Sequence, residues 1–265
     1  MLETVTVAGR PATYVRGPRR APRAAATLVC IHGAGGTHRT WLSQRLALGA
    51  RFPLVALDLP GHGDSSGEGS ATIAGYRDFV GEFMDVLGLE RVVLCGHSMG
   101  GAIVQALALE VPARVAGLVL AGTGARLRVS PKVLEQLAAG DGAAAVALLG
   151  GWAFGPGVPK ARADAWTAEI LRYVPVAVLA RDFQACDAFD DLAEVGRIAA
   201  PALAICGSAD RLTPPKYSEF FAQRLPDCRL RILEGAGHFL MLEQPEPFNA
   251  ALADFLTTLL TPRAT

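Results

Sequence analysis

A serine with a glycine two residues away on each side is the sequence's best candidate for covalent catalysis. It is Ser98, in Gly96-His97-Ser98-Met99-Gly100, which directly follows an apolar run at residues 92–95 and opens a helical stretch. A strand, a sharp turn and a helix in this order make a nucleophile elbow, whose small flanking residues let the turn lift the hydroxyl above the sheet. We therefore predict that Ser98 is a nucleophile.

The same spacing occurs a second time, in Gly63-Asp64-Ser65-Ser66-Gly67. Five-residue patterns arise by chance in a glycine-rich chain, so the surrounding structure decides between the two matches. Ser65 does not follow a strand directly, and glycines and polar residues stand where a helix should begin. We interpret this second match as a polar loop.

A serine hydroxyl needs a base to remove its proton, and an acid must orient that base. His238 lies just past the last apolar run, in Glu234-Gly235-Ala236-Gly237-His238, where its loop reaches the same sheet edge as Ser98. The other histidines lie on turns after strands, at the start of a helix, or beside the serine and pointing away from it: His32, His62, His38 and His97. His238 is the predicted general base.

The acid is expected between the serine and the histidine in the chain. Asp210 satisfies this order and lies in Gly207-Ser208-Ala209-Asp210-Arg211, where the chain leaves the apolar run at residues 202–205. The end of the preceding apolar run, at residues 121–124, offers no carboxylate. Asp58 also ends an apolar run, but it precedes the serine and adjoins Pro60-Gly61, which is typical of a turn. We predict Asp210 as the orienting acid.

Acyl transfer also needs donors for the oxygen that becomes negative in the tetrahedral intermediate. The backbone N–H of Met99, directly after the nucleophile, is one predicted donor, and the glycine-rich turn His32-Gly33-Ala34-Gly35-Gly36 supplies the other. We choose Ala34, with Gly35 as the alternative. A phosphate-binding role for this turn is disfavoured, because it lacks both the Gly-Lys-Ser/Thr ending and the spacing of a dinucleotide-binding motif.

The elements that must position these residues follow an alternating pattern. Residues 4–7 and 12–15 predict an N-terminal hairpin. Continuous apolar runs predict strands buried on both faces of a parallel sheet, at residues 28–31, 54–57, 92–95, 118–120, 202–205 and 230–233. Helices are predicted between them, at residues 38–50, 72–87, 99–109, 215–225 and 247–260. The pattern predicts an α/β fold with a doubly wound, mostly parallel, eight-stranded sheet.

The alternation breaks once, after the sixth strand. Residues 125–198 are rich in alanine and leucine and contain no convincing strand, so we predict a helical lid there and a core made of residues 1–124 and 199–265. Five aromatic residues of the lid are candidates to line a substrate pocket, although each suits the lid's own core equally well: Trp152, Phe154, Trp166, Phe183 and Phe189. Cys186 and Asp187 are weaker candidates for the mouth of the site.

The composition is that of a globular enzyme. The 265 residues are 51% hydrophobic and carry 25 basic and 25 acidic side chains, which gives no reason to expect a nucleic-acid partner. The sequence has neither a signal-peptide pattern nor an apolar run long enough for a membrane span, so we expect a soluble, cytoplasmic protein. It contains no metal-binding motif, and we expect neither a metal nor a cofactor. The oligomeric state is left open.

Together these motifs resemble the α/β-hydrolase superfamily, and specifically its small, lidded, cofactor-free members. The likeness covers most of the core: His32-Gly33, Asp58-Leu59-Pro60-Gly61-His62-Gly63, the elbow extended by Gly101, Asp210 followed by Thr213-Pro214-Pro215, and Gly237-His238 followed by Glu243-Gln244-Pro245. Ser98 stands where haloalkane dehalogenases and epoxide hydrolases of this fold carry an aspartate. Proline iminopeptidases are disfavoured because their lid is usually longer and acidic.

The resemblance implies a serine hydrolase that forms an acyl-enzyme, which water then hydrolyses. The leading interpretation is a carboxylesterase acting on a small, largely apolar ester. An enol-lactonase or a carbon-carbon bond hydrolase is the alternative, and it calls for a lid cation that binds a substrate carboxylate, with Arg126, Arg128 and Arg181 as candidates. A third interpretation, of another class, is a small-molecule receptor that retains the triad.

Overall fold

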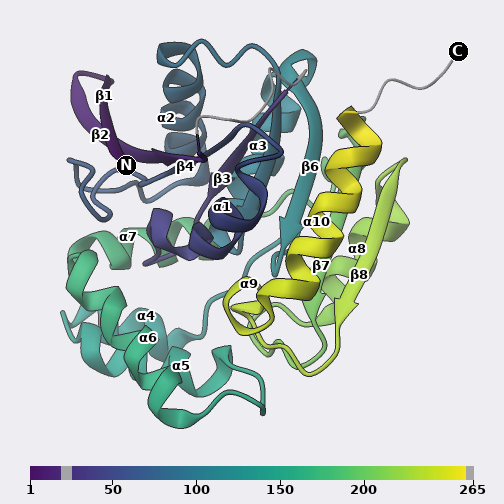
Figure 1. Cartoon of the computed structure of the whole chain (residues 1–265). Helices are drawn as coiled ribbons and strands as arrows, with labels where there is room; N and C mark the ends of the chain where they lie inside the picture. Colours follow the sequence, from purple (N-terminus) through teal and green to yellow (C-terminus); the bar gives the residue numbers. More distant parts are fainter. Residues whose placement is uncertain (19–25, 261–265) are drawn as a thin grey trace, which may run out of the picture.

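A computed structural model describes residues 1–18 and 26–260. Its eight strands form one sheet in the order β1-β2-β4-β3-β5-β6-β7-β8 (Figure 1). β1 pairs antiparallel with β2, and β2 with β4, whereas all the other neighbours are parallel. The strands are Leu2–Val7, Arg10–Arg16, Thr27–Ile31, Leu54–Leu57, Val92–His97, Val115–Ala121, Ala202–Gly207 and Cys228–Leu233. The predicted α/β fold with a mostly parallel eight-stranded sheet is confirmed.

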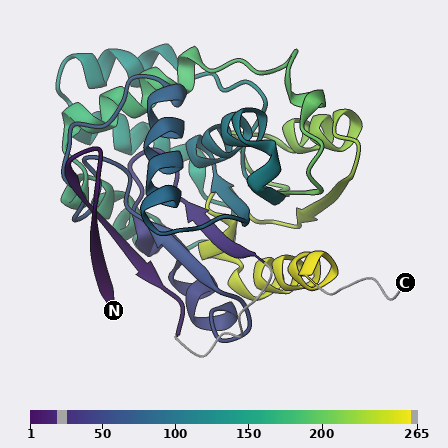
Figure 2. The same cartoon turned by 90° about the horizontal axis from the view of Figure 1, so that it is seen from above.

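Helices cover both faces of the sheet. Seen from above, α1 and α10 lie on one side, and α2 and α3 lie on the other (Figure 2). The bounds are Leu42–Leu48 for α1, Ile73–Val86 for α2, Met99–Glu110 for α3, Pro215–Arg224 for α8, Leu240–Glu243 for α9 and Pro245–Leu260 for α10. The predicted helix at residues 38–50 is shorter than expected, because its first turn, His38–Trp41, is a 3₁₀ helix capped by the Thr37 side chain.

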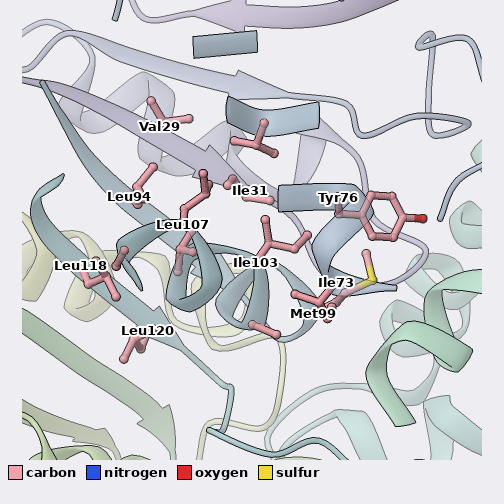
Figure 3. Packing of buried hydrophobic residues seen from close by; sticks show 14 of the residues in the cluster. Val29, Ile31, Ile73, Tyr76, Leu94, Met99, Ile103, Leu107, Leu118 and Leu120 are labelled. Carbon is pink, nitrogen blue, oxygen red and sulfur yellow. The ribbon is translucent and has the colours of Figure 1, made fainter. Parts of the chain in front are cut away.

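Each helical layer packs on its own hydrophobic cluster. On the α3 side, Ile103 and Leu107 face Ile31 and Leu94 of the sheet (Figure 3). On the α10 side, Phe248, Phe255 and their neighbours pack against the opposite face of the same strands. The central strands are therefore buried on both faces, which is the reason their sequences are continuously apolar.

Four helices lie between β6 and β7, where the alternating pattern breaks. They are α4 (Pro131–Ala138), α5 (Gly142–Ala153), α6 (Lys160–Tyr173) and α7 (Val176–Ala188), and are called the inserted helices below. They lie beyond the end of the sheet toward which the arrow of β6 points (Figure 1). They enclose a small hydrophobic cluster of their own, which includes Val133, Val146 and Leu179.

None of the helices in the described ranges combines the length and the apolar character that crossing a bilayer requires.

Candidate active site

Ser98 lies at the tip of a sharp turn between β5 and α3. Its φ and ψ angles are 52° and −117°, a strained conformation for a residue with a side chain. Gly96 and Gly100 make the turn sterically feasible, because a Cβ at Gly96 would lie 2.2 Å from Gly100 O, and one at Gly100 would lie 2.3 Å from Ile31 O. The geometry is that of a nucleophile elbow, with helix α3 starting at the next residue.

His238 and Asp210 meet beside this turn. His238 Nδ1 lies 2.9 Å from Asp210 Oδ2, and both residues are buried. A carboxylate only accepts hydrogen bonds, so Nδ1 carries a proton, and in the neutral form of the imidazole the lone pair is on Nε2. Ser98 and His238 line the same cavity. The structure thus brings all three predicted residues to one edge of the sheet.

Thr213 belongs to this site, although the sequence analysis gave it no role. Its hydroxyl donates to Asp210 Oδ2 at 2.8 Å, and the same oxygen lies 3.2 Å from His238 Nδ1. The N–H groups of Leu212 and Thr213 both donate to Asp210 Oδ1 at 2.9 Å. A threonine three residues after a predicted acid is the signal that was available, since short polar side chains often bond within such turns.

The surroundings of Asp210 keep it ionised. Burial alone would raise the pKa of this carboxyl group, but His238 and the Thr213 donors outweigh that effect and lower the pKa below its ordinary value. Asp210 therefore remains an acceptor for His238 Nδ1–H at neutral pH.

The prediction that His97 points away from the site is wrong. It lines the cavity, and its ring centroid lies 4.7 Å from that of His238. His97 Nε2 lies 3.0 Å from the carbonyl oxygen of His238, which requires Nε2 to carry a proton. Burial, together with the neighbouring His238, lowers the pKa of His97 to about 3, so it is neutral. It holds the backbone of the predicted base.

The glycine-rich loop after β3 lies beside Ser98. A Cβ built on Gly33 would be 3.0 Å from Ser98 Cβ, and Ala34 lines the same cavity as the serine. Within the described residues, neither Ala34 N–H nor Met99 N–H donates to another protein group. Gly35, the alternative donor, is different, because its N–H donates to the Asp182 carboxylate at 2.9 Å. Ala34 lines the cavity and Met99 directly follows Ser98, so both of these N–H groups lie close to the serine.

The cavity has a volume of about 260 Å³ and walls that are mostly apolar. Among the five predicted aromatic residues, Trp152 and Phe183 line it. The other three do not: Phe189 packs into the main core, Phe154 stacks between Trp166 and Phe239, and Trp166 lines a neighbouring cavity. Phe154 and Phe189 follow the last residues of α5 and α7, where the extended backbone directs their side chains away from the cavity, and Trp166 lies on another face of α6.

Of the polar candidates in the inserted region, some line the cavity and others do not. Arg128 lines the cavity, although its guanidinium donates to the Asp187 carbonyl at 2.7 Å. Arg126 pairs with Asp190, and Arg181 pairs with Glu68, outside the cavity. Cys186 lines the cavity, and burial raises the pKa of its thiol well above the ordinary value. Asp187 instead accepts the Val129 N–H at 3.1 Å.

The residues set aside in the sequence have structural partners. The Ser65 hydroxyl donates to Asp58 O and accepts the Thr13 N–H, both at 2.8 Å. The Asp58 carboxylate is fully buried and accepts the His38 N–H at 2.6 Å. These contacts fix the turn after β4.

With this geometry in hand, comparison with known proteins gives the class of the chain. Residues 28–251 match the model of the alpha/beta hydrolase family. The chain belongs to this family, and its fold and the arrangement of its elbow agree with that membership.

Two solved structures superpose on nearly the whole chain. One is a thermophilic esterase, 34% identical, with a TM-score of 0.85 over 98% of this chain and 99% of the other. The second is the enol-lactonase from Burkholderia xenovorans LB400, 27% identical, with a TM-score of 0.86 over 96% of this chain and all of the other.

One curated relative is considerably longer than this chain. It is the dihydrolipoyllysine-residue acetyltransferase component of the acetoin cleaving system from Cupriavidus necator, 30% identical over 251 residues. The match covers 88% of this chain and 64% of that relative.

Proposed function

We propose that this hydrolase is a serine carboxylesterase that cleaves small, largely apolar esters. The observation that carries the proposal is the 2.9 Å contact between His238 Nδ1 and Asp210 Oδ2, with Ser98 and His238 lining one apolar cavity. The similarity to a thermophilic esterase supports it.

The proposed reaction follows from the tautomer of His238. Its Nε2 takes the proton of Ser98 Oγ while that oxygen attacks the ester carbonyl, and Asp210 stabilises the imidazolium that forms. The N–H groups of Ala34 and Met99 stabilise the negative oxygen of the tetrahedral intermediate. His238 then gives its proton to the leaving alcohol, and a water activated in the same way releases the acid from Ser98.

We further propose that residues 125–198 act as a lid on a core formed by residues 1–124 and 199–265. Trp152, Phe183 and Leu179 reach the cavity from the inserted helices, opposite the Ser98 edge of the sheet. Their apolar surface favours an apolar acyl or alcohol group. The cavity's small volume favours short chains.

The test is hydrolysis of p-nitrophenyl esters with acyl chains from two to twelve carbons. We expect the highest kcat/KM for short chains, and a loss of roughly 10⁴-fold or more in Ser98→Ala. A fluorophosphonate probe should label the wild type and leave Ser98→Ala unlabelled. Ser65→Ala is the matched control, since its serine has the same glycine spacing, and it should keep both activity and labelling. Full activity in Ser98→Ala would contradict the proposal.

Enol-lactone hydrolysis is the second candidate, and two observations favour it. Arg128 lines the cavity, and the enol-lactonase from Burkholderia xenovorans superposes on nearly the whole chain. An enol-lactone bearing a carboxylate should then be opened faster than a p-nitrophenyl ester, with KM raised in Arg128→Met and unchanged in Arg126→Met. Equal KM values for the two variants would exclude Arg128 as the carboxylate site.

A further inference from the structure

A buried carboxylate on α7 joins the inserted helices to the loop that carries Ala34. Asp182 has no exposed surface, and three donors from the core converge on it. Its Oδ2 accepts the Gly35 N–H at 2.9 Å and lies 2.8 Å from His62 Nε2. Its Oδ1 accepts the hydroxyl of Tyr76. The Tyr76 ring lies at the edge of the main hydrophobic cluster, with its hydroxyl pointing away from the aliphatic side chains (Figure 3).

The partners of His62 require it to be an imidazolium. Its Nδ1 lies 3.0 Å from the carbonyl oxygen of Pro60, and its Nε2 faces the Asp182 carboxylate. Both partners only accept, so both nitrogens carry protons. Burial would lower the pKa of His62, but the Asp182 carboxylate outweighs it and raises the pKa. Asp182 and His62 therefore form a buried ion pair, and this pair fixes the carboxylate in place.

The two peptide groups on either side of Ala34 are held separately. The Gly33 carbonyl accepts from His32 Nδ1 at 2.8 Å and from Gly36 N–H at 3.0 Å. Because the peptide is planar and trans, this carbonyl and the Ala34 N–H reorient together, and the Gly36 N–H that holds the carbonyl comes directly after Gly35 in the chain. The next peptide presents the Gly35 N–H, and Asp182 is its acceptor. Without Asp182, the second peptide loses its anchor.

This second peptide is the softer of the two. Gly35 has a φ of 68°, which only glycine adopts at no steric cost, and glycine has the widest choice of alternative conformations. Side chains of the inserted helices also press on it, because a Cβ at Gly35 would lie 2.7 Å from Ile170 and 2.9 Å from Leu179. The loop geometry at Ala34 therefore depends on where α6 and α7 sit.

We propose that Asp182 is a positioning residue for the oxyanion site, which holds Ala34 N–H in place through Gly35 and couples that site to the inserted helices. The inference rests on the proposed esterase function. It assigns a role in the tetrahedral intermediate to a residue of α7 that touches neither Ser98 nor the cavity.

The test compares catalysis with binding of a tetrahedral mimic. In Asp182→Ala we expect kcat for a short p-nitrophenyl ester to fall roughly 10- to 100-fold, with KM within about threefold. The inhibition constant of n-butylboronic acid, which forms a tetrahedral adduct with the serine, should rise by a similar factor. Asp182→Asn keeps an acceptor for Gly35 N–H, so it should restore both values to within about threefold, although its Tm should fall.

Tyr76→Phe is the matched control. It removes a hydrogen bond to the same carboxylate and leaves the Gly35 contact intact, so it should lower Tm while changing kcat and boronate inhibition less than about threefold. If Asp182→Ala does not fold, the double variant Asp182→Ala/His62→Gln removes both buried charges. It should show the same fall in kcat and the same weakening of boronate inhibition.

These experiments distinguish failure of the proposed role of Asp182 from failure of the proposed esterase function. If the wild type turns over esters and the folded Asp182 variant keeps its kcat and boronate inhibition, Asp182 is only structural and the inference is wrong. If the wild type neither turns over esters nor binds the boronate, the proposed function fails and the inference falls with it.

Discussion

Asp210 accepts hydrogen bonds from three residues, and two of them belong to its own turn. Leu212 and Thr213 lie two and three residues after it in the chain, and only His238 comes from elsewhere. Donors of this kind stabilise the charged form of a carboxyl group. In the proposed reaction, Asp210 therefore stabilises the imidazolium of His238 without taking its proton.

Replacing Thr213 with valine tests this arrangement. Thr213→Val removes the hydroxyl donor to Asp210 Oδ2, a bond to a charged group worth about 1.5–3 kcal/mol. We expect kcat/KM to fall roughly tenfold. Thr213 lowers the pKa of Asp210, so its loss should raise that pKa and let acid inactivate the enzyme at a higher pH. A pH profile of kcat/KM measures both effects.

Thr213→Ser supplies the control, because it keeps the hydroxyl and loses only a methyl group. It should retain the wild-type profile. If serine and valine at this position behave alike, the hydroxyl does not support the acid.

Single residues also mark the limit of prediction from sequence. Ser98, Asp210 and His238 were identifiable because each lies at most five residues after the end of a parallel strand, and parallel strands end at one edge. Asp182 gave no such signal, since its partners Gly35 and His62 lie 147 and 120 residues away along the chain. A lone acid in a helix is ordinarily a solvated one.

A continuously apolar sequence made the strands predictable, but it hid the orientation of the inserted helices. A strand between two helical layers is apolar throughout, and the runs at 54–57 and 92–95 match β4 and most of β5. Helix α5 is also apolar nearly all round, in GAAAVALLGGWA, so its sequence does not say which side faces the cavity. Trp152 lines the cavity, whereas Val146 of the same helix packs into the hydrophobic cluster of the inserted helices.

Two helical glycines should respond to alanine in opposite ways. A Cβ at Gly100 in α3 would lie 2.3 Å from Ile31 O and 2.6 Å from His32 O, both backbone atoms that cannot move aside. We expect Gly100→Ala to destabilise the fold by roughly 3 kcal/mol or more, since α3 and β3 must separate. A Cβ at Gly151 in α5 meets nothing within 4 Å, so Gly151→Ala should stabilise by about 0.5–1 kcal/mol. Urea unfolding measures both changes.

Both variants add the same methyl group to a glycine in a helix, so they differ only in the atoms that surround the new Cβ. Equal effects at the two positions would show that the close approach of α3 to β3 does not constrain the elbow. A stable, active Gly100→Ala variant would contradict the geometry described for Ser98.

Buried histidines connect the site to the stability of the whole molecule. Burial lowers the pKa of His32 to about 4, and the charged His62 beside it acts in the same direction. His97 is likewise neutral, with a pKa of about 3. His62 has the opposite shift, because the Asp182 carboxylate raises its pKa above the usual value. The ordinary pKa of these histidines is 6.5. Lowering the pH below this value therefore destabilises the fold through His32 and His97, and raising the pH above it destabilises the fold through His62.

Stability should consequently be greatest near pH 6.5. Below this pH, unfolding lets His32 and His97 bind protons that they lack when folded, which costs up to about 1.4 kcal/mol per pH unit for each histidine. Above it, the stabilisation from the protonated His62 is lost as the pH rises through its folded pKa. The lowered pKa of Asp210 acts only below about 4, where the unfolded carboxyl group takes up its proton.

Urea unfolding at pH 5.0, 5.75 and 6.5 and constant ionic strength measures the acid side, and the variant His97→Gln separates its parts. Glutamine keeps an N–H donor for the His238 carbonyl but does not titrate, so the fall in unfolding free energy per pH unit should be about half that of the wild type. A slope unchanged by His97→Gln would mean that this histidine does not lose a proton on folding. It would then be charged beside His238, and its place as a neutral support of the predicted base would be wrong.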